Sequence, residues 1–165
     1  MLLKLDLSKA YDKLNWRFLA EMLRAFGFHR HWVDWVLNLV SLAFFSILVN
    51  GSSTQPFEST RGIRQGDPLS PFLFIIIAEG FRHMLMAMRE DNEIQGITLC
   101  HGLRSQSHQQ FVDDTMLMSP ASVVEARGIK LGLTTFLEAS GLEINNEKSQ
   151  VYFFNTPLIT RRNII

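Results

Sequence analysis

The chain has 165 residues, of which 47% are hydrophobic and 19% are charged, proportions typical of one folded domain rather than a disordered tail. Its 16 basic residues balance 16 acidic ones, so it lacks the net positive charge by which most proteins bind nucleic acid on their own. A single cysteine, Cys100, excludes an internal disulfide framework and a zinc site of several thiolates, and suits a reducing compartment.

The hydrophobic pattern and its stop signals predict alternating strands and helices. Asn15 can cap a helix that Gly27 ends, Asn50-Gly51 is typical of a hairpin turn, and Pro71 suits the first turn of a helix. The expected elements are a strand at 2–6, helices at 15–26 and 29–43, a hairpin over 45–58, a helix at 71–89, a short strand at 94–99, a hairpin over 108–118, a helix at 122–139 and a strand at 151–154.

This order predicts an α+β domain with one small sheet. Because the first strand begins at residue 2, we expect the chain to start inside a larger domain, and 160–163 carry no signal of a terminal element. The apolar run 72–78 is far shorter than the roughly 20 residues of a membrane span, and no export signal is evident. We therefore expect an intracellular protein without a membrane partner, and the sequence does not distinguish nucleus from cytoplasm.

The adjacent acids Asp113 and Asp114 lie between two short apolar runs, which predicts the tip of a β-hairpin. Neighbouring carboxylates repel each other and usually need a cation. Mg²⁺ suits them, because it binds one or two carboxylates and keeps positions for water and phosphates. The alternative is an ordinary tight turn, but such turns favour glycine after the aspartate, and here a second acid follows.

Two upstream acids have more evenly balanced interpretations. Asp6 ends the first apolar run, from which a carboxylate can point into a cleft, but an ordinary strand-end aspartate explains it equally well. Asp12 also suits a place just before a helix, where negative charge is favourable. Neither residue defines a metal site by itself.

The loop 61–68 and the polar run 145–148 are further candidates for ligand contacts. Glycines in the loop allow close approach of the backbone, and its arginines and glutamine can donate to phosphate, sugar or base. An ordinary surface loop remains the alternative, and Lys148 taken alone is a solvated lysine. The loop residues concerned are Arg61, Gly62, Arg64, Gln65 and Gly66.

Together, in order and spacing, these segments resemble the palm of reverse transcriptases, most closely the non-LTR, LINE-type enzymes common in plant genomes. The resemblance implies a palm with part of the fingers of a right-hand polymerase, in which a small antiparallel sheet is backed by helices. Four runs carry it: LDLSKAYD at 5–12, RGIRQGDPLSP at 61–71, FVDD at 111–114 and the segment from Gly141-Leu142 to Lys148.

The resemblance implies a site for two Mg²⁺ ions, with Mn²⁺ as a substitute. Asp6 and Asp113 would be the main ligands, Asp114 the third carboxylate, and the backbone carbonyl of Leu7 a further contact. Such a site would lower the pKa of a primer 3′-hydroxyl and hold the triphosphate.

The resemblance also implies how the nucleotide is held. The ring of Tyr11 would exclude a 2′-hydroxyl and so favour dNTPs over NTPs. Arg64, Gln65 and Gly66 would line the nucleotide and template pocket, and Lys148 would donate a proton near the departing pyrophosphate.

The implied function is RNA-directed DNA polymerisation on an RNA template with a DNA primer. Residues 1–165 would then be a palm with part of the fingers, truncated at both ends, without the upstream fingers, the thumb and the other polyprotein domains. Two alternatives stay open: a non-catalytic remnant with a structural or interaction role, and a palm-fold nucleotidyl cyclase, in which the loop 61–71 would have no role. Gln109 departs from the usual leucine, and an unpaired amide in the core would cost about 1–3 kcal/mol.

Overall fold

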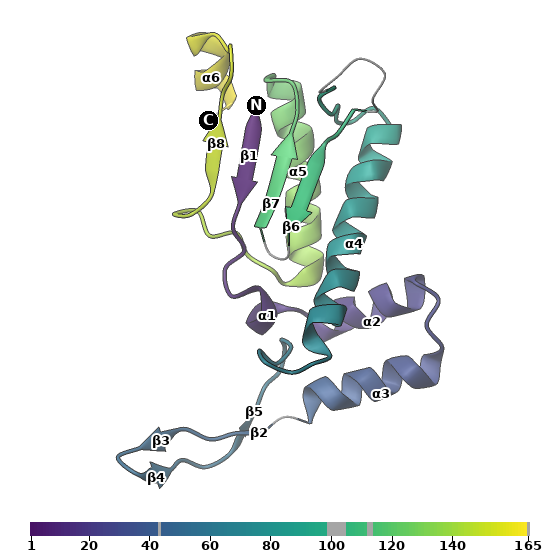
Figure 1. Ribbon diagram of the computed structural model, residues 1–165, viewed down its shortest axis with the longest axis vertical. Helices are drawn as coiled ribbons and strands as arrows, with labels where there is room; N and C mark the ends of the chain where they lie inside the picture. The colour runs from purple at the N-terminus through teal and green to yellow at the C-terminus, as the bar shows by residue number, and fades with distance from the viewer. Residues whose placement is uncertain (43, 99–104, 112–113, 165) are drawn as a thin grey trace.

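The computed structural model describes residues 1–42, 44–98, 105–111 and 114–164 and confirms the α+β class (Figure 1). The strands described are β1 (Leu2–Leu5), β2 (Phe44–Phe45), β3 (Leu48–Val49), β4 (Ser52–Ser53), β5 (Phe57–Glu58), β6 (His108–Phe111), β7 (Asp114–Met118) and β8 (Gln150–Tyr152). The helices are α1 (Ala10–Lys13), α2 (Trp16–Ala25), α3 (Arg30–Ser41), α4 (Ser70–Glu90), α5 (Val123–Ser140) and α6 (Leu158–Ile164).

The main sheet has four strands in the order β6-β7-β1-β8, and every neighbouring pair is antiparallel. Side chains alternate across it, because successive residues of a strand point to opposite faces. Leu5, Thr115 and Leu117 are buried on the face that α4 and α5 cover, whereas Asp114 and Met116 are exposed on the other face. The sheet therefore has one helix-covered face and one open face.

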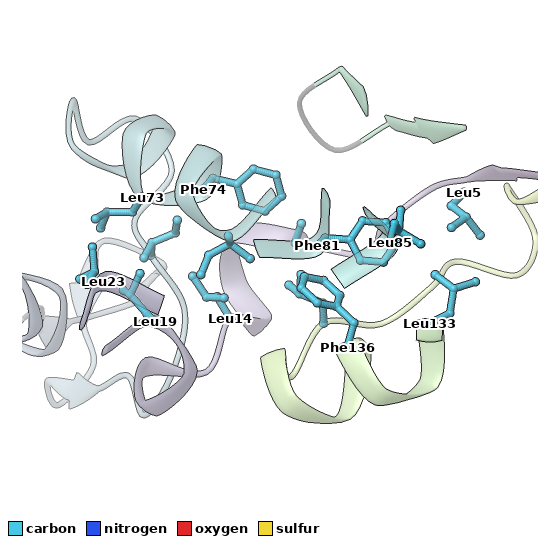
Figure 2. Close-up of a cluster of buried hydrophobic side chains, with 14 of the residues drawn as sticks. Leu5, Leu14, Leu19, Leu23, Leu73, Phe74, Phe81, Leu85, Leu133 and Phe136 are labelled. Carbon is cyan, nitrogen blue, oxygen red and sulfur yellow. The ribbon is translucent and has the colours of Figure 1, made fainter. Parts of the chain in front are cut away.

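The hydrophobic core is continuous from the sheet to the helices at the opposite end of α4 (Figure 2). One face of α4 runs through both halves, since its buried residues recur at helical spacing. Leu5, Leu133 and Phe136 lie with Phe81 of α4 at the sheet end. The other end is formed by Leu14, Leu19, Leu23 and Leu73.

Helix α4 has 21 residues, which at 1.5 Å per residue is about 30 Å. It is long and apolar enough to cross a membrane by those two measures, although the apolar run inside it is short. A third of its most apolar window is buried in the protein (33%), and it packs against α2, α5 and β6. These contacts identify α4 as a core helix of this fold.

Several local signals act as the sequence predicts. The side chain of Asn15 accepts a hydrogen bond from the Arg17 amide, which caps α2. Asn50 and Gly51 both have positive φ, 50° and 83°, and join β3 to β4 in a tight hairpin. Gly141 ends α5 with φ of 75°. Each of these residues satisfies a backbone requirement of its own position.

Two expectations about secondary structure are wrong, and one short helix was not expected. The segment expected as a strand at 94–99 forms only an isolated bridge between Ile97 and Gln106 in its described part, and Leu99 lies outside the described residues. The chain forms a short helix, α1, soon after β1, where the sequence suggested only a nearby helix start. Residues 160–163, which carried no signal, belong to α6.

Candidate active site

The pairing of β1 with β7 brings two of the predicted acids together. Leu5 is paired with Thr115, so one further step along this register sets Asp6 opposite Asp114. Strand alternation puts both on the open face of the sheet, together with Lys4. The Lys4 Nζ atom lies 3.9 Å from Oδ1 of Asp114. A cationic side chain of the protein thus lies beside Asp114 at this end of the two strands.

These residues fit a divalent cation by their chemistry. Two carboxylates from adjacent strands supply hard oxygen ligands, which Mg²⁺ prefers. Among the described residues no group of three or more metal-binding side chains occurs. The remaining predicted ligand, Asp113, lies outside the described residues.

The segment after α5 holds the backbone of Asp6 on its free side. The Asp6 amide donates to Oγ of Ser149 at 3.1 Å, and the Asp6 carbonyl accepts from the Asn145 amide at 2.8 Å. Leu7 forms an isolated antiparallel bridge with Ile144. Within the described chain, the hydrogen bonds of this bridge use the Asp6 carbonyl and the Ser8 amide, so the Leu7 carbonyl lies outside it.

Lys148 lies in the same segment as these contacts. Its side chain is exposed, and its amide donates to the backbone carbonyl and the side-chain oxygen of Asn145. Because Ser149 follows immediately and bonds to Asp6, the structure brings Lys148 close to the first acid. The backbone of Lys148 therefore lies near that of Asp6, and its role in the site remains a prediction.

The loop that contains Gly62 is bonded directly to α1 and the residues around it. The Gly62 amide donates to the Leu14 carbonyl at 2.7 Å, and the Ile63 amide donates to the Tyr11 carbonyl at 2.7 Å. The indole Nε1 of Trp16 donates to the Gly62 carbonyl at 2.6 Å. These three bonds fix the loop to the segment that follows Asp6.

Gly62 is required by its surroundings as well as by its backbone angle. Its φ is +89°, and a Cβ there would lie 2.6 Å from the Asp12 carbonyl oxygen. Gly66 also has positive φ, +86°, but no atom would meet its Cβ within 4 Å. The first glycine therefore permits close packing on α1, and the second only a turn.

A cleft of about 490 Å³ opens beside this loop. Arg64 and Gln65 line it and are exposed, and the Gln65 side chain donates to Oδ1 of Asp12 at 3.3 Å. Phe45 and Phe57, from β2 and β5, also line the cleft, with ring centroids 6.0 Å apart. The cleft therefore combines cationic, amide and aromatic groups.

Tyr11 is half-buried in α1, and its ring stacks on that of Phe74 from α4. The structure thus joins Tyr11 to the loop that carries Arg64 and Gln65, since the Ile63 amide bonds to the Tyr11 carbonyl and the Gln65 side chain bonds to Asp12. Asp6 and Lys148 are joined through the segment after α5.

One charged pair links the two groups of residues. Lys13, at the end of α1, forms an ion pair with Glu143, in the segment before Asn145. The hydrogen bond and charge of Lys13 hold the pKa of Glu143 below its usual value, and Arg61 acts in the same direction. The exposed carboxylate therefore remains ionised and attached to α1.

The energetic cost expected for an unpaired Gln109 amide in the core does not arise. Gln109 is exposed and lies opposite Met116 on the open face, so its amide reaches solvent. The neighbouring Gln110 is half-buried beside Thr115 and donates to its hydroxyl at 3.5 Å. No core penalty arises from either amide.

Sequence reasoning missed three residues that support the site: Asn145, Ser149 and Trp16. The run from Asn145 to Ser149 is polar and short, which is a signal for a side-chain-capped turn. Its partner, Asp6, is 143 residues from Ser149 in sequence. Local patterns do not identify such a distant contact.

The match to protein families covers residues 1–161, and the matching family is described as reverse transcriptase (RNA-dependent DNA polymerase). The chain is 31% identical over 147 residues to the Pol polyprotein of the type-2 retrotransposable element R2DM of Drosophila melanogaster, covering 87% of this chain and 13% of that protein. It is 27% identical over 144 residues to the Pol polyprotein of a type-1 element R2 of Popillia japonica, covering 87% and 23%. The chain thus spans less than a quarter of either relative.

Solved telomerase structures share this fold. The telomerase of Candida albicans, solved in complex with a TWJ fragment of telomeric RNA, matches with a TM-score of 0.69 and 15% identity, over 93% of this chain and 28% of that one. The apo telomerase of Candida tropicalis, truncated at its C-terminal domain, matches with a TM-score of 0.69 and 16% identity, over 95% and 31%. The likeness confirms the polymerase palm.

The relatives support the non-LTR retrotransposon class, and nothing in them supports the narrower likeness to plant elements. The family match extends over nearly the whole chain and includes all four runs that carried the resemblance. The chain belongs to the reverse transcriptase family, as a fragment of the non-LTR retrotransposon type.

Proposed function

We propose that residues 1–165 are the palm, with part of the fingers, of a larger RNA-directed DNA polymerase, and that this region adds dNTPs to a DNA primer on an RNA template. The observation that supports this most directly is the β1–β7 register, which sets Asp6 opposite Asp114 on the open face of the sheet. Carboxylates from two strands on an uncovered face leave room for a nucleic-acid duplex.

In this proposal Asp6, Asp113 and Asp114 hold two Mg²⁺ ions, with the Leu7 carbonyl as a further ligand and Mn²⁺ as a substitute. The bound metal would lower the pKa of the primer 3′-hydroxyl and neutralise charge on the triphosphate. The acids themselves provide the negative charge that concentrates cations at the strand ends. Lys4, next to Asp114, limits that charge when no cation is bound.

The surrounding residues bind and orient the nucleotide. The ring of Tyr11, which stacks on Phe74, packs against the sugar. Arg64, Gln65 and Gly66 contact nucleotide and template from the loop beside the cleft. Lys148 donates a proton to the leaving pyrophosphate. The exposure of Arg64 and Lys148 supports these roles, because both charged groups can reach a phosphate.

The remaining domains of a retroelement polyprotein would be the partners of this region. The two relatives are several times longer than the length matched here. The chain has no net charge, and phosphate contacts supply most non-specific affinity for nucleic acid. We therefore expect much of the grip on template and primer to come from those domains.

Primer extension on poly(rA)/oligo(dT) with dTTP and Mg²⁺ tests the proposal. The wild-type chain is compared with Asp113→Asn/Asp114→Asn and with the control Asp34→Asn, which changes an exposed acid on α3. Extension by the wild type and the control, but not by the double variant, supports the proposed site. Equal extension by all three overturns it. No extension by folded wild type would favour a non-catalytic remnant.

A further inference from the structure

The register between β1 and β8 changes at Asp6. Lys4 is paired with Gln150, but the next pairing on this side joins Leu7 to Ile144. Two residues lie between these pairs on the β1 side, whereas the five residues 145–149 lie between them on the other. The extra residues form a turn instead of a strand, so no regular ladder partner lies beside Asp6.

The hydroxyl of Ser149 takes the place of that missing partner. It accepts the Asp6 amide at 3.1 Å, a bond that a backbone carbonyl would accept in a regular ladder. On the same side, the Asn145 amide donates to the Asp6 carbonyl at 2.8 Å. The backbone amide and the backbone carbonyl of Asp6 are therefore both bonded to one turn.

The turn is held in shape by Asn145 itself. Its side-chain oxygen accepts the amides of Glu147 at 3.1 Å and Lys148 at 3.3 Å, and its backbone carbonyl accepts the Ser149 amide at 2.9 Å. An asparagine that accepts backbone amides two and three residues ahead fixes a compact turn. Ser149 is thus oriented toward Asp6 by the same residue that bonds the Asp6 carbonyl.

We propose that Asn145 and Ser149 are positioning residues, which hold the Asp6 carboxylate in the orientation that binds a divalent cation. The inference rests on the proposed function, since it needs Asp6 to be a metal ligand. A ligand whose backbone is bonded at both polar groups loses less freedom when it binds. Removing such supporting contacts typically lowers metal affinity about 10–100-fold.

Binding of Mn²⁺, followed by the electron paramagnetic resonance of the free ion, tests this without polymerisation. Ser149→Ala removes the acceptor, Ser149→Thr keeps a hydroxyl, and Asn145→Ala releases the turn. Ser41→Ala, a serine that bonds a backbone carbonyl at the end of α3, is the matched control. Asp6→Asn reports on the ligand itself. Urea denaturation verifies that each variant is folded.

We expect Ser149→Ala and Asn145→Ala to weaken Mn²⁺ binding about tenfold, and Ser149→Thr and Ser41→Ala to bind as the wild type does. Amide exchange at Asp6 should accelerate in Ser149→Ala and return to the wild-type rate in Ser149→Thr. Wild-type affinity in Ser149→Ala, with weak binding by Asp6→Asn, would overturn the positioning role and leave the metal site intact. Unchanged affinity in Asp6→Asn would overturn the proposed site, and the positioning role with it.

Discussion

The ring of Tyr11 lies nearly parallel to that of Phe74, with 5.0 Å between the ring centroids and 13° between the planes. Phe74 belongs to the long helix α4 and is buried, so its ring cannot move aside easily. A side chain that excludes a 2′-hydroxyl must resist displacement by the sugar. The stacking provides that resistance, and it connects the proposed sugar selectivity to the core of the fold.

Replacing Tyr11 with alanine should therefore relax selectivity between dNTPs and NTPs. The change removes the whole ring, and we expect the preference for dNTPs to fall by roughly tenfold or more, the scale of discrimination by shape in a pocket. The measurement is the ratio of kcat/KM for dTTP and UTP. Tyr11→Phe keeps the ring and should keep the ratio. Equal ratios in Tyr11→Ala and wild type would remove Tyr11 from this role.

The two positive-φ glycines of the loop should differ sharply in their tolerance of alanine. Both substitutions strain the backbone by about 1–2 kcal/mol. Only Gly62→Ala also forces a methyl group against the Asp12 carbonyl, which adds roughly 1–3 kcal/mol of overpacking. Urea denaturation should therefore show a larger loss of unfolding free energy for Gly62→Ala than for Gly66→Ala. Similar losses would mean that the loop does not pack closely on α1.

Asp6→Asn should abolish polymerisation and leave the fold intact. The backbone bonds of Asp6 do not involve its carboxylate, so the unfolding free energy should change by less than about 0.5 kcal/mol. Loss of a charged group at the reacting centre should lower kcat by roughly a hundredfold or more. Primer extension and urea denaturation of the same preparation measure both effects. Substantial residual activity would contradict the assignment of Asp6.

Stability should fall on mild acidification because of His108. Burial lowers the pKa of this imidazole, Arg82 and Arg89 of α4 lower it further, and Glu79 opposes them. As pH falls below the ordinary value of about 6.5, the unfolded chain takes up a proton that the folded chain does not bind. The unfolding free energy should therefore decrease from pH 7.5 to pH 5.5.

The variant His108→Gln should reduce this pH dependence, whereas His31→Gln, which changes an exposed residue of α3, should leave it in place. Urea midpoints at the two pH values provide the comparison. The ion-paired Glu143 does not interfere, since the hydrogen bond and charge of Lys13 lower its pKa and it titrates under more acidic conditions. An unchanged slope in His108→Gln would assign the effect to other groups.

The C-terminal region should cause self-association. Leu158 and Ile159 of α6 are 69% and 75% exposed, and Phe154 before them is 68% exposed. Large apolar side chains exposed close together in sequence favour aggregation. Leu158→Lys/Ile159→Lys should lower the apparent mass in light scattering, and Leu131→Lys, on α5, should not. A monodisperse wild type at high concentration would refute this expectation.

The N-terminal strand lies inside the main sheet. The structure places β1 between β7 and β8, where Leu5 is buried and the preceding residues are half-buried. A strand at one end of a sequence can lie in the middle of a sheet, because strand order depends on distant partners.

Local chemistry was sufficient wherever a residue satisfies its own backbone. Asn15, Gly51, Pro71 and Gly141 indicated element ends correctly for this reason. The helix α6 was not expected from the sequence, although Pro157 stands just before its first residue. The prediction of a strand at 94–99 was wrong because a short apolar run forms a strand only where a partner strand pairs with it.

Candidate residues for the site could be named from the sequence, but their arrangement could not. The acids and the loop were identified by their order along the chain, whereas the contacts that join them are between distant residues. Gly62 meets Leu14, and Ser149 meets Asp6, through bonds that no local periodicity encodes. The position of Asp113 remains a prediction, since this residue lies outside the described part of the chain.

The interior position of β1 has a consequence for how the chain folds during synthesis. The Met1 amino group bonds to the Ser119 carbonyl, 118 residues away, and Asp6 bonds to Ser149, 143 residues away. At roughly 5–20 residues per second, a ribosome needs on the order of ten seconds to supply these partners. Until then β1 is an unpaired apolar strand. Contacts of such long range slow folding, so β1 stays open to association with other chains for longer than a strand whose partner follows it directly in sequence.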